Sequence, residues 1–256
     1  MILTLDIGNT NVKTALFEGM DMVEYWRVST NRDMSSDEYG ILLMNLFAHK
    51  GISASLVEGI MISSVVPQIN FTIEHMCQSY FGMEPRIIGP GVKTGINIKY
   101  ENPRELGADR IANAVAAYEL YGGPCITIDF GTATSFGAIS ARGEFLGGAI
   151  CPGLKLAAEA LTERAAKLPR FELAKPESVI GRNTVTNMQA GIVYGYIGQV
   201  NYLVERMKRE LGAPHAKVIA TGGLATLVAG ESNVIDVMDG LLTLKGLCLI
   251  YQKNAA

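Results

Sequence analysis

The pattern of hydrophobic and polar positions begins with an apolar run over residues 2–7, which ends in a polar turn and resumes as an alternating run. Asp6 lies at the end of the first run, Gly8 opens the turn, and Lys13 lies in the second run. Two such runs around a short Gly- and Asn-containing turn predict a β-hairpin. Glycine lets a ligand approach the backbone, turn amides bind phosphate oxygens, and lysine adds a charge. Taken alone, the stretch fits an ordinary hairpin equally well.

The same pattern recurs in the second half of the chain. Residues 126–134 repeat the character of residues 3–11, and Asp129 stands at the position of Asp6. The offset, 129 − 6 = 123 residues, is close to half of the 256-residue chain. A Thr, an Asp and a Gly shared at one offset predict a duplicated fold, in which the two hairpins face each other across a cleft.

Between and after the hairpins, strand patterns alternate with helix patterns, which is typical of an α/β fold. A capping box at residues 35–38 opens the first predicted helix, which ends before Gly51. Further helices are predicted at 71–81, 108–121, 154–166, 184–211 and 241–251, and further strands at 23–28, 60–66, 86–88, 125–129, 135–140, 144–150, 217–220 and 234–237. Residues 89–103 form a loop that is long enough to suggest a function. We expect two domains, 1–114 and 115–256.

The predicted helix over residues 184–211 contains Gly191, Gly195 and Gly198. Each glycine costs a free helix about 1 kcal/mol relative to alanine. A close approach between helices would explain them, either within the domain or across a dimer interface.

Composition narrows the class of protein. Hydrophobic residues make up 48% of the chain, and the net charge of −3 predicts no general affinity for nucleic acid. The four cysteines show neither CxxC pairing nor zinc-ligand spacing, which favours buried free thiols in a reducing compartment. We find no signal-peptide pattern and no apolar run near the ~20 residues of a membrane span. We therefore expect a soluble cytoplasmic protein with no membrane partner.

Six motifs occur in order between residues 6 and 225: Asp6-x-Gly8-Asn9-Thr10-x-x-Lys13, Tyr100-Glu101-Asn102-Pro103-Arg104, Gly107-Ala108-Asp109-Arg110, Asp129-Phe130-Gly131-Thr132-Ala133-Thr134, Gly181-Arg182-Asn183-Thr184 and Ala220-Thr221-Gly222-Gly223-Leu224-Ala225. Their order and spacing resemble type III pantothenate kinase, of the actin-like ATPase superfamily that includes sugar and acetate kinases. The resemblance implies two duplicated actin-like (ribonuclease H-like) domains with a nucleotide cleft between them. It also implies ATP-dependent phosphorylation of pantothenate to 4′-phosphopantothenate, the first step of coenzyme A biosynthesis, by a homodimer.

The resemblance also implies the roles of particular residues. ATP contacts are expected from both hairpins and the Gly-Gly turn: Asp6, Ile7, Gly8, Asn9, Thr10, Asn11, Val12, Lys13, Thr132, Gly222 and Gly223. Pantothenate contacts are expected from Tyr100, Gly107, Ala108, Asp109, Arg110 and Thr184. Asp6 would hold Mg²⁺, directly or through water, and Asp129 would hold a monovalent cation, K⁺ or NH₄⁺. From the sequence alone, Asp129 is equally suited to a second Mg²⁺.

Asp109 is the expected catalytic base, although an Asp at a helix start is more often a cap or a dipole partner. Its neighbours favour function, because a glycine precedes it and an arginine follows it. Two positions depart from the family pattern: Gly137 stands where Asp is usual, and Arg182 where Lys is common. Two alternatives stay open. One is a different small-molecule kinase of the superfamily, and the other is a non-catalytic nucleotide-binding regulator or actin-like assembly protein.

Overall fold

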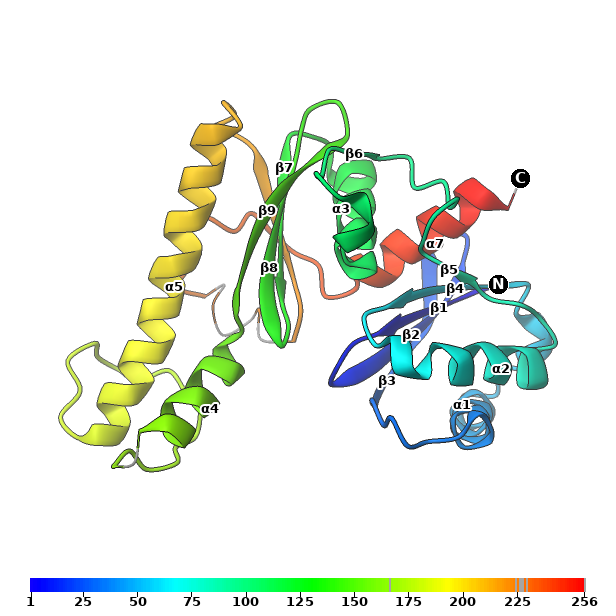
Figure 1. Ribbon diagram of the computed structural model, residues 1–256, viewed down its shortest axis with the longest axis horizontal. Helices are drawn as coiled ribbons and strands as arrows, with labels where there is room; N and C mark the ends of the chain where they lie inside the picture. Colours follow the sequence, from blue (N-terminus) through cyan, green and yellow to red (C-terminus); the bar gives the residue numbers. More distant parts are fainter. Residues whose placement is uncertain (166, 224, 226–227, 229, 256) are drawn as a thin grey trace. The chain divides into compact units, whose positions relative to one another are not determined.

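The structure is a computed structural model that describes residues 1–165, 167–223, 225, 228 and 230–255 (Figure 1). The chain divides into two units, the first made of Met1–Ile96, Tyr100–Ala116 and Leu241–Ala256, the second of Asn97–Lys99 and Ala117–Gly240. This division differs from the sequence-based one, because the closing helix joins the first unit. Both units combine a sheet with helices, which confirms the predicted α/β class.

The first unit is built on a five-stranded sheet in the order β3-β2-β1-β4-β5. Its strands are β1 (Ile2–Ile7), β2 (Asn11–Glu18), β3 (Asp21–Ser29), β4 (Gly59–Ser64) and β5 (Arg86–Ile87). β1, β2 and β3 form antiparallel hairpins, and β4 joins β1 in parallel. The predicted first hairpin is therefore present, and β1 lies at the centre of the sheet.

Helices of the first unit cover both faces of this sheet. They are α1 (Ser36–His49) and α2 (Asn70–Phe81) on one face and α7 (Leu242–Asn254) on the other. α3 (Ala108–Tyr121), whose last residues belong to the second unit, approaches α7 closely at Gly246, and short 3₁₀ turns lie at Ala54–Leu56, Pro67–Ile69 and Pro103–Glu105. Leu3, Leu5 and Ile7 pack with residues of α1 and α2 in one apolar core. Because strand side chains alternate, Thr4 and Asp6 lie on the opposite face, against which α7 packs. The predicted capping box at Ser35 and Glu38 is formed.

The second unit is built on a six-stranded sheet in the order β11-β10-β7-β8-β9-β6. Its strands are β6 (Asn97–Ile98), β7 (Cys125–Phe130), β8 (Ala133–Ile139), β9 (Glu144–Pro152), β10 (Lys217–Thr221) and β11 (Val237–Met238). β7 and β8 form the predicted second hairpin, and β10 joins β7 in parallel as β4 joins β1. The duplication predicted from the repeat is visible in these two hairpins.

One face of the second sheet packs on α5 (Thr184–Glu210), while α4 (Leu154–Arg164) follows β9. Ile126, Ile128 and Phe130 of β7 share an apolar core with α5 residues such as Val193 and Val200. Asn183 caps α5, because its side-chain oxygen accepts a hydrogen bond from the Thr186 amide. Thr127 and Asp129 alternate with the core residues and so lie on the other face.

Several elements differ from the sequence-based expectation. The short strand β6 lies within the predicted loop at 89–103, because the amide of Asn97 donates to the Gly143 carbonyl beside β9. Two paired residues are too few to give an alternating pattern. β11 is shorter and later than the predicted strand at 234–237. Ala166, in a predicted helix, and Leu224, in a predicted motif, lie outside the described residues.

The surroundings of the α5 glycines rule out one of the two explanations that the sequence offered for them. A Cβ atom added at Gly191, Gly195 or Gly198 would meet no atom within 4 Å. A close helix approach within the described part of the chain therefore does not explain them. The dimer alternative remains.

The four cysteines are free thiols. Burial raises the pKa values of Cys77, Cys125 and Cys248 to about 12, so these thiols stay protonated and unreactive at neutral pH. Cys151 is half-buried, and burial also raises its pKa. Among the described helices, none is long and apolar enough to cross a membrane.

Candidate functional site

The first hairpin places a carboxylate and an ammonium group side by side. Asp6 on β1 is the register partner of Lys13 on β2, and Asp6 Oδ2 lies 3.5 Å from Lys13 Nζ. Asp6 is only 7% exposed, because β1 is the central strand and α7 packs on this face. A carboxylate in such a place needs a positive partner, and Lys13 supplies it.

The turn between these strands is fixed from outside the hairpin. Thr30 donates through Oγ1 to the Gly8 carbonyl at 2.6 Å, and its amide donates to the Thr10 carbonyl at 3.0 Å. Asn9 and Thr10 are exposed, and Arg32 Nη2 donates to Asn9 Oδ1 at 3.2 Å. The turn therefore combines exposed backbone with a second positive charge, which suits an anion. Sequence reasoning missed Thr30 and Arg32, whose signal was only a polar stretch after a strand.

The first unit also contains the residues predicted to contact pantothenate, with the exception of Thr184. The Arg110 guanidinium lies over the Tyr100 ring, 5.8 Å from its centroid, and Arg110 is buried. Asp109 Oδ1 accepts a hydrogen bond of 2.8 Å from the Arg110 amide. A Cβ atom at Gly107 would lie 2.5 Å from Asp109 Oδ1. Gly107 thus leaves room for the carboxylate at the start of α3, which begins at Ala108.

In the second unit, Asp129 lies near the carboxyl end of β7, as Asp6 lies near the carboxyl end of β1. Asp129 is the register partner of Ser135 on β8 and of Thr221 on β10. The Gly222 backbone has φ +99°, and an added Cβ atom would lie 2.6 Å from the backbone of Phe130. The Gly222–Gly223 turn therefore lies against the end of β7, beside Asp129. Ligands of α/β proteins bind at such carboxyl ends of parallel strands.

The turn of the second hairpin is held by the residue that precedes α4. The Gly153 amide donates to the Thr132 carbonyl at 3.0 Å, and an added Cβ atom at Gly153 would lie 2.4 Å from that oxygen. The Thr134 hydroxyl forms a hydrogen bond with the Tyr196 hydroxyl, which attaches the hairpin to α5. Burial raises the pKa of Tyr196 to about 12, so this phenol stays protonated.

Gly137 is a departure from the family pattern that the packing explains. An added Cβ atom would lie 2.6 Å from Thr127 Oγ1 and 2.9 Å from the Phe145 ring. These two side chains occupy the space that a longer residue needs. An Asp at position 137 would require both to move, so the chain uses no carboxylate there.

Thr184 lies in the second unit, unlike the other predicted pantothenate contacts. It is the first residue of α5 and borders a hollow of about 350 Å³ whose other lining residues are Leu161, Leu168, Asn187, Met188, Gly191 and Ile192. This lining is mainly apolar and comes from α4, the following loop and α5. Neither Asp129 nor the Gly222–Gly223 turn belongs to it.

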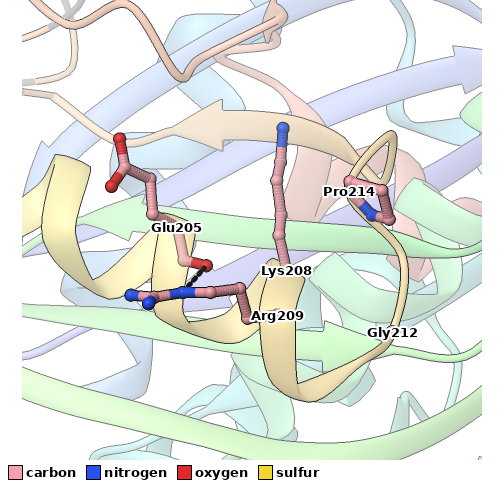
Figure 2. Close-up of a pocket in the computed structure, with 5 residues that line it drawn as sticks. All are labelled: Glu205, Lys208, Arg209, Gly212 and Pro214. Atoms are coloured by element: carbon pink, nitrogen blue, oxygen red, sulfur yellow. Dashed lines mark hydrogen bonds between the residues drawn. The ribbon is translucent and has the colours of Figure 1, made fainter.

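A larger hollow, of about 640 Å³, lies at the end of α5 before β10 (Figure 2). Glu205, Lys208, Arg209, Gly212 and Pro214 line it. In Figure 2 the Arg209 side chain lies along α5, where its Nε donates to the Glu205 carbonyl at 3.4 Å. The lining contains none of the predicted site residues, and we assign it no chemistry.

The donor sets fit the ions that the family resemblance implied. Among the described residues, no three His, Cys, Asp or Glu side chains gather around a common point. Mg²⁺ does not need such a cage in kinases, because it keeps several waters and binds one or two carboxylates plus substrate phosphates. Asp6 suits that role. Asp129 lies between two hydroxyl-bearing residues and offers oxygen donors to a cation.

Comparisons with known proteins show the family and the fold of the chain. A model of the type III pantothenate kinase family matches residues 2–206. The fold is similar to that of a Campylobacter jejuni protein provisionally described as a Baf family transcriptional activator, with 19% identity, a TM-score of 0.63 and coverage of 99% of this chain and 98% of that one. It is also similar to a provisionally described N-acetylmannosamine kinase from Listeria monocytogenes (13% identity, TM-score 0.56, coverage 100% and 99%) and to a ROK hexokinase from Thermus thermophilus (12%, 0.55, 99% and 99%). These identities support the actin-like kinase fold alone.

Replacing Gly222 tests the close approach that shapes the second site. We expect the positive φ of Gly222 to lower the free energy of unfolding of Gly222→Ala by about 1–3 kcal/mol. The collision of the added Cβ atom with the Phe130 backbone should lower it further. Gly212→Ala is the matched control, because Gly212 has φ +61° but no atom within 4 Å of an added Cβ. Urea denaturation measures both. Equal losses for the two variants would contradict the close approach.

Proposed function

Because the chain belongs to the type III pantothenate kinase family, we propose that it transfers the γ-phosphoryl group of ATP to the primary hydroxyl of pantothenate. The products are ADP and 4′-phosphopantothenate, and the reaction opens coenzyme A biosynthesis. One observation carries the proposal beyond the family match. The first unit holds both an Asp6–Lys13 hairpin suited to phosphates and an Asp109–Arg110 pair suited to a hydroxy acid. An ATP-dependent enzyme with four free thiols fits the cytoplasm.

Phosphoryl transfer needs positioning and charge stabilisation more than covalent chemistry. Lys13 and the exposed turn at Asn9 and Thr10 are the groups that would bind phosphate oxygens. Asp6 would hold Mg²⁺, which neutralises phosphate charge when bound. In the second unit, Thr132 and the Gly222–Gly223 turn would contact the nucleotide.

The proposed binding of pantothenate depends on the Arg110 guanidinium. A planar guanidinium meets a carboxylate at two points, and the Tyr100 ring holds this one in place. Pantothenate carries both a carboxylate and a primary hydroxyl. With its carboxylate on Arg110, Asp109 would accept the proton of the attacking hydroxyl. Gly107, Ala108 and Thr184 are the remaining proposed pantothenate contacts.

A second candidate is a kinase of the same superfamily that acts on another small molecule. The sugar kinases among the fold neighbours favour it, since they share the architecture. An ADP-release assay with pantothenate, hexoses, glycerol and acetate separates the two. We expect activity with pantothenate alone. Activity with a hexose but not with pantothenate would overturn the proposal.

Asp109→Asn tests the catalytic base. Asparagine keeps the shape and an accepting oxygen but removes the basicity, so we expect kcat to fall by ~10²-fold or more with nearly unchanged ATP binding. The matched control is Asp37→Asn, because Asp37 is also the second residue of its helix, α1, and also acidic. Steady-state kinetics at saturating pantothenate measure both variants. Wild-type kcat in Asp109→Asn would make Asp109 a structural residue.

Activity should depend on a monovalent cation held by Asp129. The cation would offset phosphate charge beside the second hairpin, so we expect faster turnover in K⁺ or NH₄⁺ than in Na⁺ at matched ionic strength. Asp129→Asn should lower the rate and remove the difference between ions. Equal wild-type rates in Na⁺ and K⁺ would count against this assignment.

The protein should be a homodimer that uses the glycine-bearing face of α5. Gly191, Gly195 and Gly198 leave open space at this face, into which a partner's side chains could pack closely. Light scattering at micromolar concentration should give twice the 27.5 kDa chain mass. Gly195→Trp should yield monomers, whereas Ile41→Trp, at an exposed position of α1, should not. A wild-type enzyme that is monomeric and fully active would contradict this prediction.

A further inference from the structure

A buried serine lies beside the Asp6–Lys13 pair. Ser63 on β4 is the register partner of Asp6 on β1, so Lys13, Asp6 and Ser63 follow one another across three adjacent strands. Register partners in neighbouring strands place their side chains on the same face of the sheet. For Ser63 this is the face opposite the apolar core that contains its neighbour Ile62.

The Ser63 hydroxyl has an unusual status. Ser63 is fully buried, and its Oγ has no hydrogen-bond partner among the described residues. Buried polar atoms are nearly always paired, and each exception in a native structure calls for an explanation. A hydroxyl that destabilises the ligand-free protein is explained if it gains a partner in another state of the site.

The neighbouring serine shows the ordinary arrangement. Ser64 points to the other face, where its Oγ donates to Asn70 Oδ1 at 2.5 Å and accepts from the Val66 amide at 3.2 Å. These bonds hold the chain where β4 ends and the turn before α2 begins. The two adjacent serines therefore differ both in the face they occupy and in their hydrogen bonds: the hydroxyl of Ser64 is satisfied, and that of Ser63 is not.

We propose that Ser63 is a positioning residue that donates its hydroxyl hydrogen bond to the Asp6 carboxylate when ATP and Mg²⁺ are bound. Without ligand, Asp6 is paired with Lys13 at 3.5 Å. Phosphate competes for the lysine and the cation competes for the carboxylate, so binding draws this pair apart. The carboxylate then needs a donor to fix its orientation, and Ser63 lies on the strand beside it. This inference rests on the proposed function.

The test compares Ser63→Ala with Ser64→Ala in the full-length protein. Melting temperatures without ligand give the first readout. Calorimetric titrations of ATP, at a series of Mg²⁺ concentrations and in EDTA, give the second. We expect Ser63→Ala to melt at or above the wild-type temperature, because it loses an unpaired buried hydroxyl. We expect its Mg²⁺ requirement for ATP binding to rise by about tenfold, because a hydrogen bond to a charged group is lost. Binding in EDTA should not change.

Ser64→Ala should show the opposite behaviour, with a lower melting temperature and an unchanged Mg²⁺ requirement. Ser63→Cys, whose somewhat larger thiol is a weak donor, should give an Mg²⁺ requirement between those of Ser63→Ala and the wild type. An unchanged Mg²⁺ requirement in Ser63→Ala, beside Mg²⁺-dependent ATP binding in the wild type, would overturn this inference alone. A lowered melting temperature in Ser63→Ala would do the same, since the hydroxyl would then be structural. Absence of ATP binding in the wild type would overturn the proposed function together with it.

Discussion

The site depends on one constraint, which is that a carboxylate at the end of a buried central strand must be paired. Asp6 is almost fully covered, and Lys13 on the neighbouring strand compensates its charge. This arrangement fixes the hairpin register, because a shift of one residue would place Lys13 in the apolar core on the other face. It also keeps two charged groups ready for ligands of opposite sign, and these are the two groups that we propose bind a metal nucleotide.

Glycines decide how closely the other parts of the site can approach. Gly222 lets its turn lie against the backbone of Phe130, Gly153 lets α4 start on the Thr132 carbonyl, and Gly107 leaves room for Asp109. At each of these positions a single methyl group would collide with a neighbouring atom. Close packing also excludes a longer side chain at Gly137, because Thr127 and Phe145 occupy the space that it would need. Small residues therefore shape both units, and not only the two hairpin turns.

Local features of this fold could be predicted from the sequence, whereas features that depend on distant pairing could not. The two hairpins and the cap of α1 depend on residues that are close together in the sequence, and all three are present in the structure. Thr30 and Ser63 reach the first hairpin through strand pairing, which no local pattern encodes. The closing helix α7 showed its helical pattern but not which unit it would join. The α5 glycines indicated close packing, and only coordinates could show that no described part of the chain supplies it.

We propose that the Asp6–Lys13 hairpin is the binding site for a metal nucleotide. Calorimetric titration of ATP into the wild type, Asp6→Asn and Lys13→Met, each with Mg²⁺ and with EDTA, tests it most directly. We predict that Asp6→Asn loses the part of the affinity that depends on Mg²⁺ and keeps the rest. Lys13→Met should bind ATP more weakly in both conditions, because its positive charge faces the phosphates themselves. Wild-type affinities in both variants, with Mg²⁺ present, would contradict the account.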